Sequence, residues 1–461
     1  MLKDALPSMK TTVPGPRTRE LLEKRGREIP RGIHCDLPVA IRRGEGAMIE
    51  DMDDNVYLDW TGGVGVLNLG YSRPELVEAV SGQARKYFHV MMDVMTHAPY
   101  LDLAEKLNQI VPVRGDHRKT MFLNSGGECD ETAIKVARIY TGRPRIMVFS
   151  GAYHGIAAKY TEGTDQKKSG GVGAFANDVC KAVFPNLNRR PDGMDETEAI
   201  AYYLKKMEEV FTPENPVEDC AAIIFEPVQG VGGLVPAPLE WVRQVRKFCD
   251  AHGILMICDE VQSGWARTGR MFGADYYAEA GAPPDMILTA KAIAGGLPLG
   301  SVTARDEIMD AVPAGIVGGT FCGNPVSCAA ALEVVRLMEE EDAPAKARHI
   351  GEQVLSAWQS WQQEYEMIGD CRGMGAMLGM ELVHSRKGKE PWPEAVRGVI
   401  EAAVQRGLLL KSAGARGNVI RFLSPLCVTD AQVEAGLSIM KDCLDEVQET
   451  MGRAPHGEEM K

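Results

Sequence analysis

The sequence predicts an α/β protein, with a large, mostly parallel sheet flanked by helices and a smaller α+β domain. Short, uniformly apolar segments alternate with amphipathic helical segments through the middle of the chain, as in residues 220–261. Strands that are apolar along their whole length are typical of a parallel sheet buried on both faces. A chain of 461 residues is also long enough to form two domains.

The large sheet is expected to include five strands, because each of these segments is short, apolar and bounded by turn residues. The expected strands are residues 119–123, 145–151, 220–227, 254–261 and 286–288, and the expected helices between them include 128–140 and 240–253. The second helix should stop at Gly253, since glycine commonly follows the last helical turn.

The last third of the chain has a different pattern. Two helices are expected at 325–341 and 393–407, and short strands at 375–383, 407–412 and 418–423. These elements predict a small domain over 331–450, after a large domain over 61–330. Residues 1–60, with a hairpin at 46–60, should join the small domain in space, and residues 451–461 should form a disordered tail.

Composition and charge exclude several classes of function. The formal net charge is -13, which opposes binding to nucleic-acid phosphates. No apolar run approaches the length of about 18 residues that a membrane span needs, and residues 1–10 lack a signal-peptide core. Eleven scattered cysteines without a C-x-x-C pair favour reduced thiols in the cytoplasm, and nothing in the histidine spacing indicates a metal site.

Four kinds of unusual residue follow the expected strands, and each alone has an ordinary explanation. Gly126 and Gly127 open a helix, where backbone N–H groups can bind phosphate or simply form a turn. Asp259 is either a solvated strand end or a carboxylate aimed at a cationic nitrogen. Tyr153 either packs or offers a stacking surface. Lys291 is the one charged side chain in residues 286–300, although burying an ammonium group is costly.

One cofactor accounts for all four. Pyridoxal phosphate needs a lysine for its aldehyde, an acid for its ring nitrogen, a stacking surface and a phosphate cup. Lys291, Asp259, Tyr153 and the Gly126–Gly127 turn provide these groups, each at the end of an expected strand. A Schiff base would make the buried ammonium of Lys291 part of the cofactor, so the sequence predicts a pyridoxal-phosphate enzyme.

With these residues in place, the chain resembles the class III pyridoxal-phosphate aminotransferases of fold type I over residues 15–448, and among them the 4-aminobutyrate aminotransferases. The resemblance covers nearly the whole chain in many ordered motifs. The matching segments include "NSGGECDETAIKVAR", "GAYHG", "EPVQGVGG", "CDEVQSGWARTG", "AKAIAGGLPLG", "GGTFCGNPVSCAAALEV" and "GNVIRFLSPL".

The resemblance implies a role for further residues around the cofactor. Asp259 would keep the ring nitrogen protonated, Val261 would pack under the ring opposite Tyr153, and Gln262 would reach the phenolic oxygen. Thr320 would complete the phosphate cup from the neighbouring subunit. The expected active unit is therefore a homodimer, alone or within a dimer of dimers.

The resemblance also implies a substrate site, with one clear departure from the family pattern. Arg421 would bind a substrate carboxylate through two hydrogen bonds, and Glu226 would pair with Arg421 when that carboxylate is absent. Val64 would line the pocket. Ile156 stands where the 4-aminobutyrate and ornithine branches have an arginine for the distal carboxylate, and Lys159 is the nearest cation that could replace it.

The leading hypothesis is an aminotransferase that moves an amino group from an amino acid or an ω-amino acid to a 2-oxo acid such as pyruvate or 2-oxoglutarate. A racemase or 2-epimerase of the same family is the alternative, because it needs Arg421 but no second carboxylate site. A lyase and a cofactor-binding protein without catalysis remain further possibilities. The set of Lys291, Asp259 and Arg421 argues against the last of these.

Overall fold

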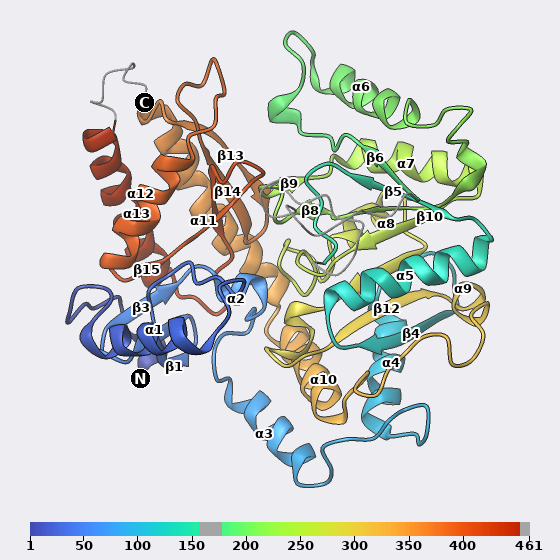
Figure 1. Ribbon diagram of the computed structural model, residues 1–461, viewed down its shortest axis with the longest axis horizontal. Helices are drawn as coiled ribbons and strands as arrows, with labels where there is room; N and C mark the ends of the chain where they lie inside the picture. The colour runs from blue at the N-terminus through green and yellow to red at the C-terminus, as the bar shows by residue number, and fades with distance from the viewer. Residues whose placement is uncertain (156–177, 452–461) are drawn as a thin grey trace.

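The computed structural model describes residues 1–155 and 178–451 (Figure 1). The expected disordered tail at 451–461 therefore lies outside the described residues except for Met451, which is the last residue of a helix and not part of a tail. Its largest sheet has seven strands in the order β4-β12-β11-β10-β7-β5-β6. These strands are β4 (Arg118–Leu123), β12 (Gly300–Arg305), β11 (Met286–Thr289), β10 (Leu255–Asp259), β7 (Cys220–Phe225), β5 (Arg145–Phe149) and β6 (Val179–Ala182).

The large sheet is mostly parallel, as the sequence predicts. Neighbouring strands from β11 to β6 pair in parallel, and β12 runs antiparallel to both β11 and β4. Strands β12 and β6 were not expected from the sequence. Strand β12 contains the polar residues Ser301 and Thr303, whose hydroxyls are buried against Thr289 and Thr120 at 2.8 Å. Cross-strand hydrogen bonds therefore replace the apolar pattern that marks the other central strands.

Two helices cover the two faces of the central strands. Helix α5 (Gly126–Thr141) packs with Leu255 and Ile257 of β10, whereas Met256 and Cys258 belong to the cluster on the side of α7 (Leu239–His252). Successive side chains of a strand point to opposite faces. Asp259, the last residue of β10, therefore faces the α5 side of the sheet.

Helix α7 ends before Gly253, as the sequence predicts, and α5 extends one residue beyond its expected end, to Thr141. Gly142 after α5 has a φ of 69°, and Gly253 after α7 has a φ of 63°, a conformation that glycine adopts without strain. The other α-helices of the described residues are α1 (Pro16–Glu28), α2 (Gly62–Gly65), α3 (Pro74–Ala84), α4 (Ala98–Ile110), α6 (Glu196–Glu208), α8 (Ala274–Glu279), α9 (Asp306–Asp310), α10 (Pro325–Glu340), α11 (Ala343–Glu364), α12 (Pro393–Gln405) and α13 (Asp430–Met451). The 3-10 helices of the same part are η1 (Leu2–Asp4), η2 (Leu187–Arg189), η3 (Val217–Asp219) and η4 (Lys291–Ala294). Within this described part, no helix has the length and apolar character that crossing a membrane requires.

A second, antiparallel sheet lies in the C-terminal part, which we call the C-terminal sheet. Its order is β13-β14-β17-β16, with β13 (Ile368–Met374), β14 (Met377–Leu382), β17 (Val419–Phe422) and β16 (Lys411–Ala413). A short hairpin of β8 (Val228–Gln229) and β9 (Val235–Pro236) follows β7.

The N-terminal strands pair with a C-terminal strand. The sheet β1-β2-β3-β15 contains β1 (Ile41–Glu45), β2 (Met48–Asp51), β3 (Val56–Asp59) and β15 (Leu408–Leu409), and β15 runs parallel to β3. The segment expected as one strand at 407–412 is thus divided between two sheets, β15 and β16. In Figure 1 the N-terminal strands lie beside the C-terminal helices α12 and α13. We retain domain limits near residues 60 and 330 as a proposal.

Candidate active site

Five predicted site residues lie together at the carboxyl edge of the large sheet. A cavity of about 590 Å³ is lined by Gly126, Gly127, Tyr153, Val261 and Lys291, among other residues. They follow β4, β5, β10 and β11, whose carboxyl ends meet at this edge. Ligands bind at this edge in open parallel sheets.

Lys291 reaches the cavity through an unusual backbone conformation. It begins η4, directly after β11 and Ala290, and has a φ of 44°. A left-handed backbone costs a residue other than glycine about 1–3 kcal/mol, and such residues concentrate at functional sites. Burial lowers the pKa of the Lys291 amine, while the negative charges of Asp259 and Glu226 oppose that change. An amine with a lowered pKa is a better nucleophile near neutral pH.

Asp259 forms a buried ion pair that the sequence analysis missed. Its Oδ2 lies 2.7 Å from Nδ1 of His154, and its Oδ1 accepts a hydrogen bond of 2.9 Å from the Val261 backbone N–H. Asp130 of α5 also faces this imidazole, with Oδ1 at 3.7 Å from Nδ1. All three of these side chains are buried. Two features of the sequence could have indicated this cluster, namely the histidine directly after Tyr153 and the aspartate one helical turn beyond Gly126.

The electrostatics of this cluster have clear physical causes. Burial opposes a charged imidazole, but the hydrogen bond and charge of Asp259, together with the charge of Glu226, raise the pKa of His154. Burial and the negative charge of Asp259 raise the pKa of Asp130. The cluster therefore favours a charged His154 beside Asp259 and makes Asp130 the carboxyl group that resists ionisation.

The residues around the cavity fit pyridoxal phosphate. The first N–H groups of a helix have no acceptor within it, and Gly126 and Gly127 supply them at the start of α5. A Cβ atom at Gly126 would lie 2.7 Å from Cγ1 of Val261, so the close approach requires glycine. Ser125 caps α5 by accepting a hydrogen bond from the Glu128 N–H, and the Glu128 carboxylate accepts a hydrogen bond of 2.8 Å from the Asn124 N–H.

Gln262 is held beside the cavity with one atom unsatisfied. Its Nε2 donates to the Val64 carbonyl oxygen at 3.2 Å, and its buried Oε1 has no hydrogen-bond partner within the described part of the chain. Val64 itself is half-buried, with a φ of 64°. A buried acceptor without a partner is costly, and a phenolic hydroxyl group from a bound cofactor would satisfy it.

Arg421 and Glu226 are both buried but do not pair with each other. The Arg421 Nε donates to the Ser412 carbonyl oxygen at 3.0 Å. Glu226 accepts hydrogen bonds from the N–H groups of Tyr153 and Gly230, at 3.0 and 2.9 Å. No ion pair within 4.0 Å joins the two side chains, in contrast to the predicted pairing, because backbone donors already satisfy the carboxylate. Burial lowers the pKa of Arg421 to about 10, opposed by the charge of Glu226.

Thr320, a predicted cofactor residue, is not among the residues that line this cavity. Thr320 is exposed, in a turn that precedes α10. Ile156 lies outside the described residues, and so does Lys159. The geometry around the cavity thus brings together the predicted cofactor residues except Thr320.

Comparison with known proteins identifies the family. Residues 32–444 match the family described as aminotransferase class-III. The chain belongs to the class III aminotransferases. The 4-aminobutyrate aminotransferase of Escherichia coli strain K12 is 39% identical over 435 residues, which cover 94% of this chain and 99% of the relative. The 5-aminovalerate aminotransferase of Pseudomonas putida strain KT2440 is 38% identical over 430 residues, 93% of this chain and 98% of the relative.

Solved structures agree with this assignment. An (S)-enantioselective ω-transaminase from Thermomicrobium roseum has a TM-score of 0.85 and 30% identity, and the match covers 93% of this chain and 98% of that one. An amine transaminase from an uncultivated Pseudomonas species, solved with pyridoxal phosphate bound, has a TM-score of 0.81 and 30% identity, covering 89% and 95%. The predicted fold type, family and cofactor are confirmed. When bound, pyridoxal phosphate carries the amino group and stabilises negative charge on the carbon that bears it.

The buried carboxylate of Glu226 should make the stability of this aminotransferase depend on pH. Burial and the charge of Asp259 raise the pKa of Glu226 from 4.5 to about 7. Between pH 4.5 and about pH 7, the Glu226 carboxyl loses its proton in the unfolded chain but keeps it in the folded chain. The free energy of unfolding of the wild type therefore falls as the pH rises through this range. A shift of this size corresponds to on the order of 3 kcal/mol. Glu226→Gln removes the effect, and its melting temperature relative to wild type should therefore rise between pH 5 and pH 8.

The control is Glu208→Gln, a change at an exposed glutamate of α6. Its melting temperature relative to wild type should stay constant over the same pH range. A constant difference for Glu226→Gln as well would contradict the raised pKa of Glu226.

Proposed function

We propose that this aminotransferase takes the amino group of an ω-amino acid with a single carboxylate and transfers it to a monocarboxylic 2-oxo acid. 4-Aminobutyrate and 5-aminovalerate, the substrates in the names of two relatives, are the donors we test first. The observation that carries the proposal is the buried guanidinium of Arg421, which makes one hydrogen bond within the described residues, through Nε, and lies near the carboxylate of Glu226. A buried arginine binds a carboxylate strongly because both groups are withdrawn from water.

In this proposal each residue in or beside the cavity has a separate role. Lys291 holds the cofactor covalently and moves the proton during transfer, while Asp259, supported by His154, keeps the ring nitrogen protonated. Gly126 and Gly127 bind the phosphate. The lowered pKa of Lys291 supports its role, since an amine must lose its proton to act as a base.

The substrate side follows the same logic. Arg421 binds the carboxylate, and Glu226 balances the charge of Arg421 at a distance when no carboxylate is bound. Val64 forms an apolar wall. An isoleucine at 156 cannot pair with a second carboxylate. A site that lacks a partner for a charged group disfavours substrates that carry that group, here the dicarboxylic 2-oxo acids. Pyruvate should therefore rival or exceed 2-oxoglutarate as acceptor.

We also propose that the active unit is a homodimer. Thr320 is exposed beside Phe321, which is 64% exposed, and Phe88, on the neighbouring loop, is 70% exposed. The Asn324 Nδ2 donates to the Phe88 carbonyl oxygen at 2.9 Å, so these loops form one surface. Clustered exposed aromatic residues are typical of protein interfaces, and two-fold pairing is the commonest arrangement.

A cytoplasmic location completes the proposal. All eleven cysteines are free thiols in the structure, and most are buried. Free thiols persist in reducing compartments, which supports the cytoplasm.

Acceptor choice tests the role of Ile156. With one ω-amino acid as donor, the wild type should use pyruvate at least as well as 2-oxoglutarate, and Ile156→Arg should raise kcat/KM for 2-oxoglutarate by about tenfold, as expected for a new charge-assisted contact. Ile156→Leu is the matched control and should change neither acceptor. Strong wild-type preference for 2-oxoglutarate would mean that another residue binds its second carboxylate.

Incubation with a single chiral amino acid and no acceptor tests the racemase alternative, which predicts loss of optical activity.

The covalent role of Lys291 has a direct chemical test. Borohydride reduction of the holoenzyme should fix the cofactor to the peptide that contains Lys291, and Lys291→Ala should abolish turnover while the melting curve remains cooperative. Lys181→Ala, at an edge strand of the sheet, is the control and should retain activity. Peptide mapping that finds the reduced cofactor on another lysine would refute the assignment.

A further inference from the structure

Arg421 shares one face of the C-terminal sheet with a second charged group. In the register of β14 and β17, Gly379 lies opposite Arg421 and Glu381 lies opposite Val419. Paired residues project to the same face, and so do residues two positions apart along a strand. The face that carries the candidate substrate arginine therefore also carries Glu381, two residues along β14 from the partner of Arg421.

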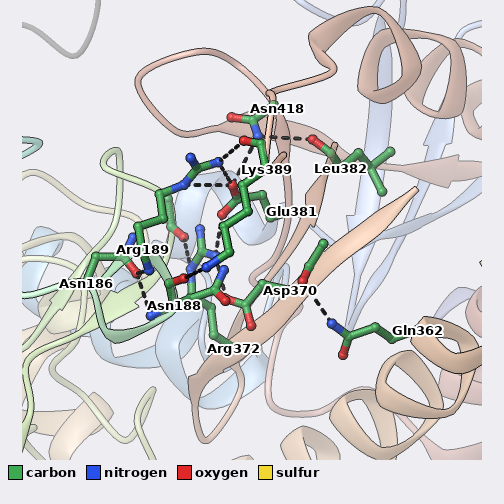
Figure 2. A network of polar contacts seen from close by, with 12 residues as sticks. Asn186, Asn188, Arg189, Gln362, Asp370, Arg372, Glu381, Leu382, Lys389 and Asn418 are labelled. Atoms are coloured by element: carbon green, nitrogen blue, oxygen red, sulfur yellow. Dashed lines mark hydrogen bonds and ion pairs between the residues drawn. The ribbon is translucent and has the colours of Figure 1, made fainter. Parts of the chain in front are cut away.

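Glu381 joins this sheet to the part of the chain that contains the large sheet (Figure 2). Its Oε1 accepts a hydrogen bond of 3.0 Å from Nε of Arg189, which belongs to η2 and follows β6. The Arg189 Nη2 forms an ion pair with the same oxygen. The Glu381 Oε2 accepts a bond of 2.6 Å from Nη1 of Arg372 on β13. Glu381 is only 3% exposed, so one buried carboxylate binds two guanidinium groups. The two groups come from opposite sides of the boundary between the C-terminal sheet and the part of the chain that contains the large sheet.

Two further bonds cross the same boundary and reach the β8–β9 hairpin. The Arg372 Nε donates to the Gly233 carbonyl oxygen at 2.9 Å, and the Gly414 N–H donates to the Val231 carbonyl oxygen at 3.0 Å. The same hairpin segment contains Gly230, whose N–H donates to Glu226. The polar contacts thus link the sheet that carries Arg421 to the segment that holds Glu226.

Apolar packing cannot replace these contacts along part of the boundary. A cavity of about 830 Å³ lies there, and its lining includes Arg189, Arg372, Glu381, Gly414 and Asn418. A boundary next to a cavity of this size moves more easily than a close-packed one. Removing one partner of a buried ion pair is also costly, because the other charge remains withdrawn from water.

We propose that Glu381, clamped between Arg189 and Arg372, is a positioning residue that sets the place of Arg421 relative to Glu226 and so determines affinity for carboxylate-bearing donors. The inference rests on the proposed role of Arg421 as the carboxylate site. Neither Arg189 nor Glu381 lines the candidate cofactor cavity, so their effect on substrate passes through the sheet.

The test compares binding and kinetics of five holoenzyme variants: Arg189→Met, Glu381→Gln, the double variant of these two, Arg421→Gln and Arg190→Met. Arg190 is the matched control, because among residues 1–155 and 178–451 its guanidinium donates only to the nearby Met194 and Leu187 carbonyl oxygens, at 2.8 and 2.9 Å. Calorimetry measures the Kd of valerate, a carboxylate without an amino group. Steady-state assays with pyruvate compare 5-aminovalerate with 1-phenylethylamine, an amine without a carboxylate.

Arg189→Met and Glu381→Gln should each weaken valerate binding and raise KM for 5-aminovalerate by about tenfold, the effect of one lost charge-assisted contact. Their kcat values and the KM for 1-phenylethylamine should change less than about twofold. The double variant should be no worse than Glu381→Gln alone, because that change already breaks the contact with Arg189. Arg190→Met should match wild type.

Three results would overturn the inference. If Arg421→Gln weakens valerate binding but Arg189→Met and Glu381→Gln do not, the clamp does not position Arg421. If those variants lose both donors equally, their role is structural only. If Arg421→Gln itself leaves valerate binding unchanged, the proposed carboxylate site fails, and the inference fails with it.

Discussion

The candidate site depends on a single carboxylate buried at the end of a central strand. Strand alternation turns Asp259 toward α5, away from water, where an unpaired charge would be costly. The imidazole of His154 and the Val261 N–H satisfy it. Because Val261 lies against Gly126, the same contact fixes the start of α5 and with it the turn that we propose binds phosphate.

The other charges of the site are arranged around this one. Asp259 lies close enough to change the pKa values of Glu226, Lys291 and Asp130, so each of these groups is tuned by a neighbour as well as by burial. The substrate side is built differently, because Arg421 comes from the C-terminal sheet. Its position relative to the cofactor residues is therefore a property of the boundary between the two parts of the chain, where the Arg189–Glu381–Arg372 contacts lie (Figure 2).

The sequence predicts the parts of the site that follow from local pattern. Lys291, Asp259 and Gly126 each follow an apolar strand, and the carboxyl ends of parallel strands must meet. Residue pairing across the chain leaves no such local pattern. His154 looks like any residue of a turn until Asp259, 105 positions away, is placed beside it. Arg189 and Glu381 are 192 positions apart. Strand β12 was missed for the same reason, because its polar Ser301 is buried only through a hydrogen bond to Thr289 on the neighbouring strand.

The protonation of His154 tests the central claim most directly. In protein labelled with ¹⁵N-histidine, with the signal assigned through His154→Gln, the imidazole of the wild type should remain doubly protonated at a pH above the ordinary pKa of histidine, because the hydrogen bond to Asp259 raises its pKa. In Asp259→Asn the same ring should become neutral at that pH, since the compensating charge is gone while the burial remains. A neutral His154 in the wild type, or one that titrates alike in both proteins, would contradict the role given to this buried pair.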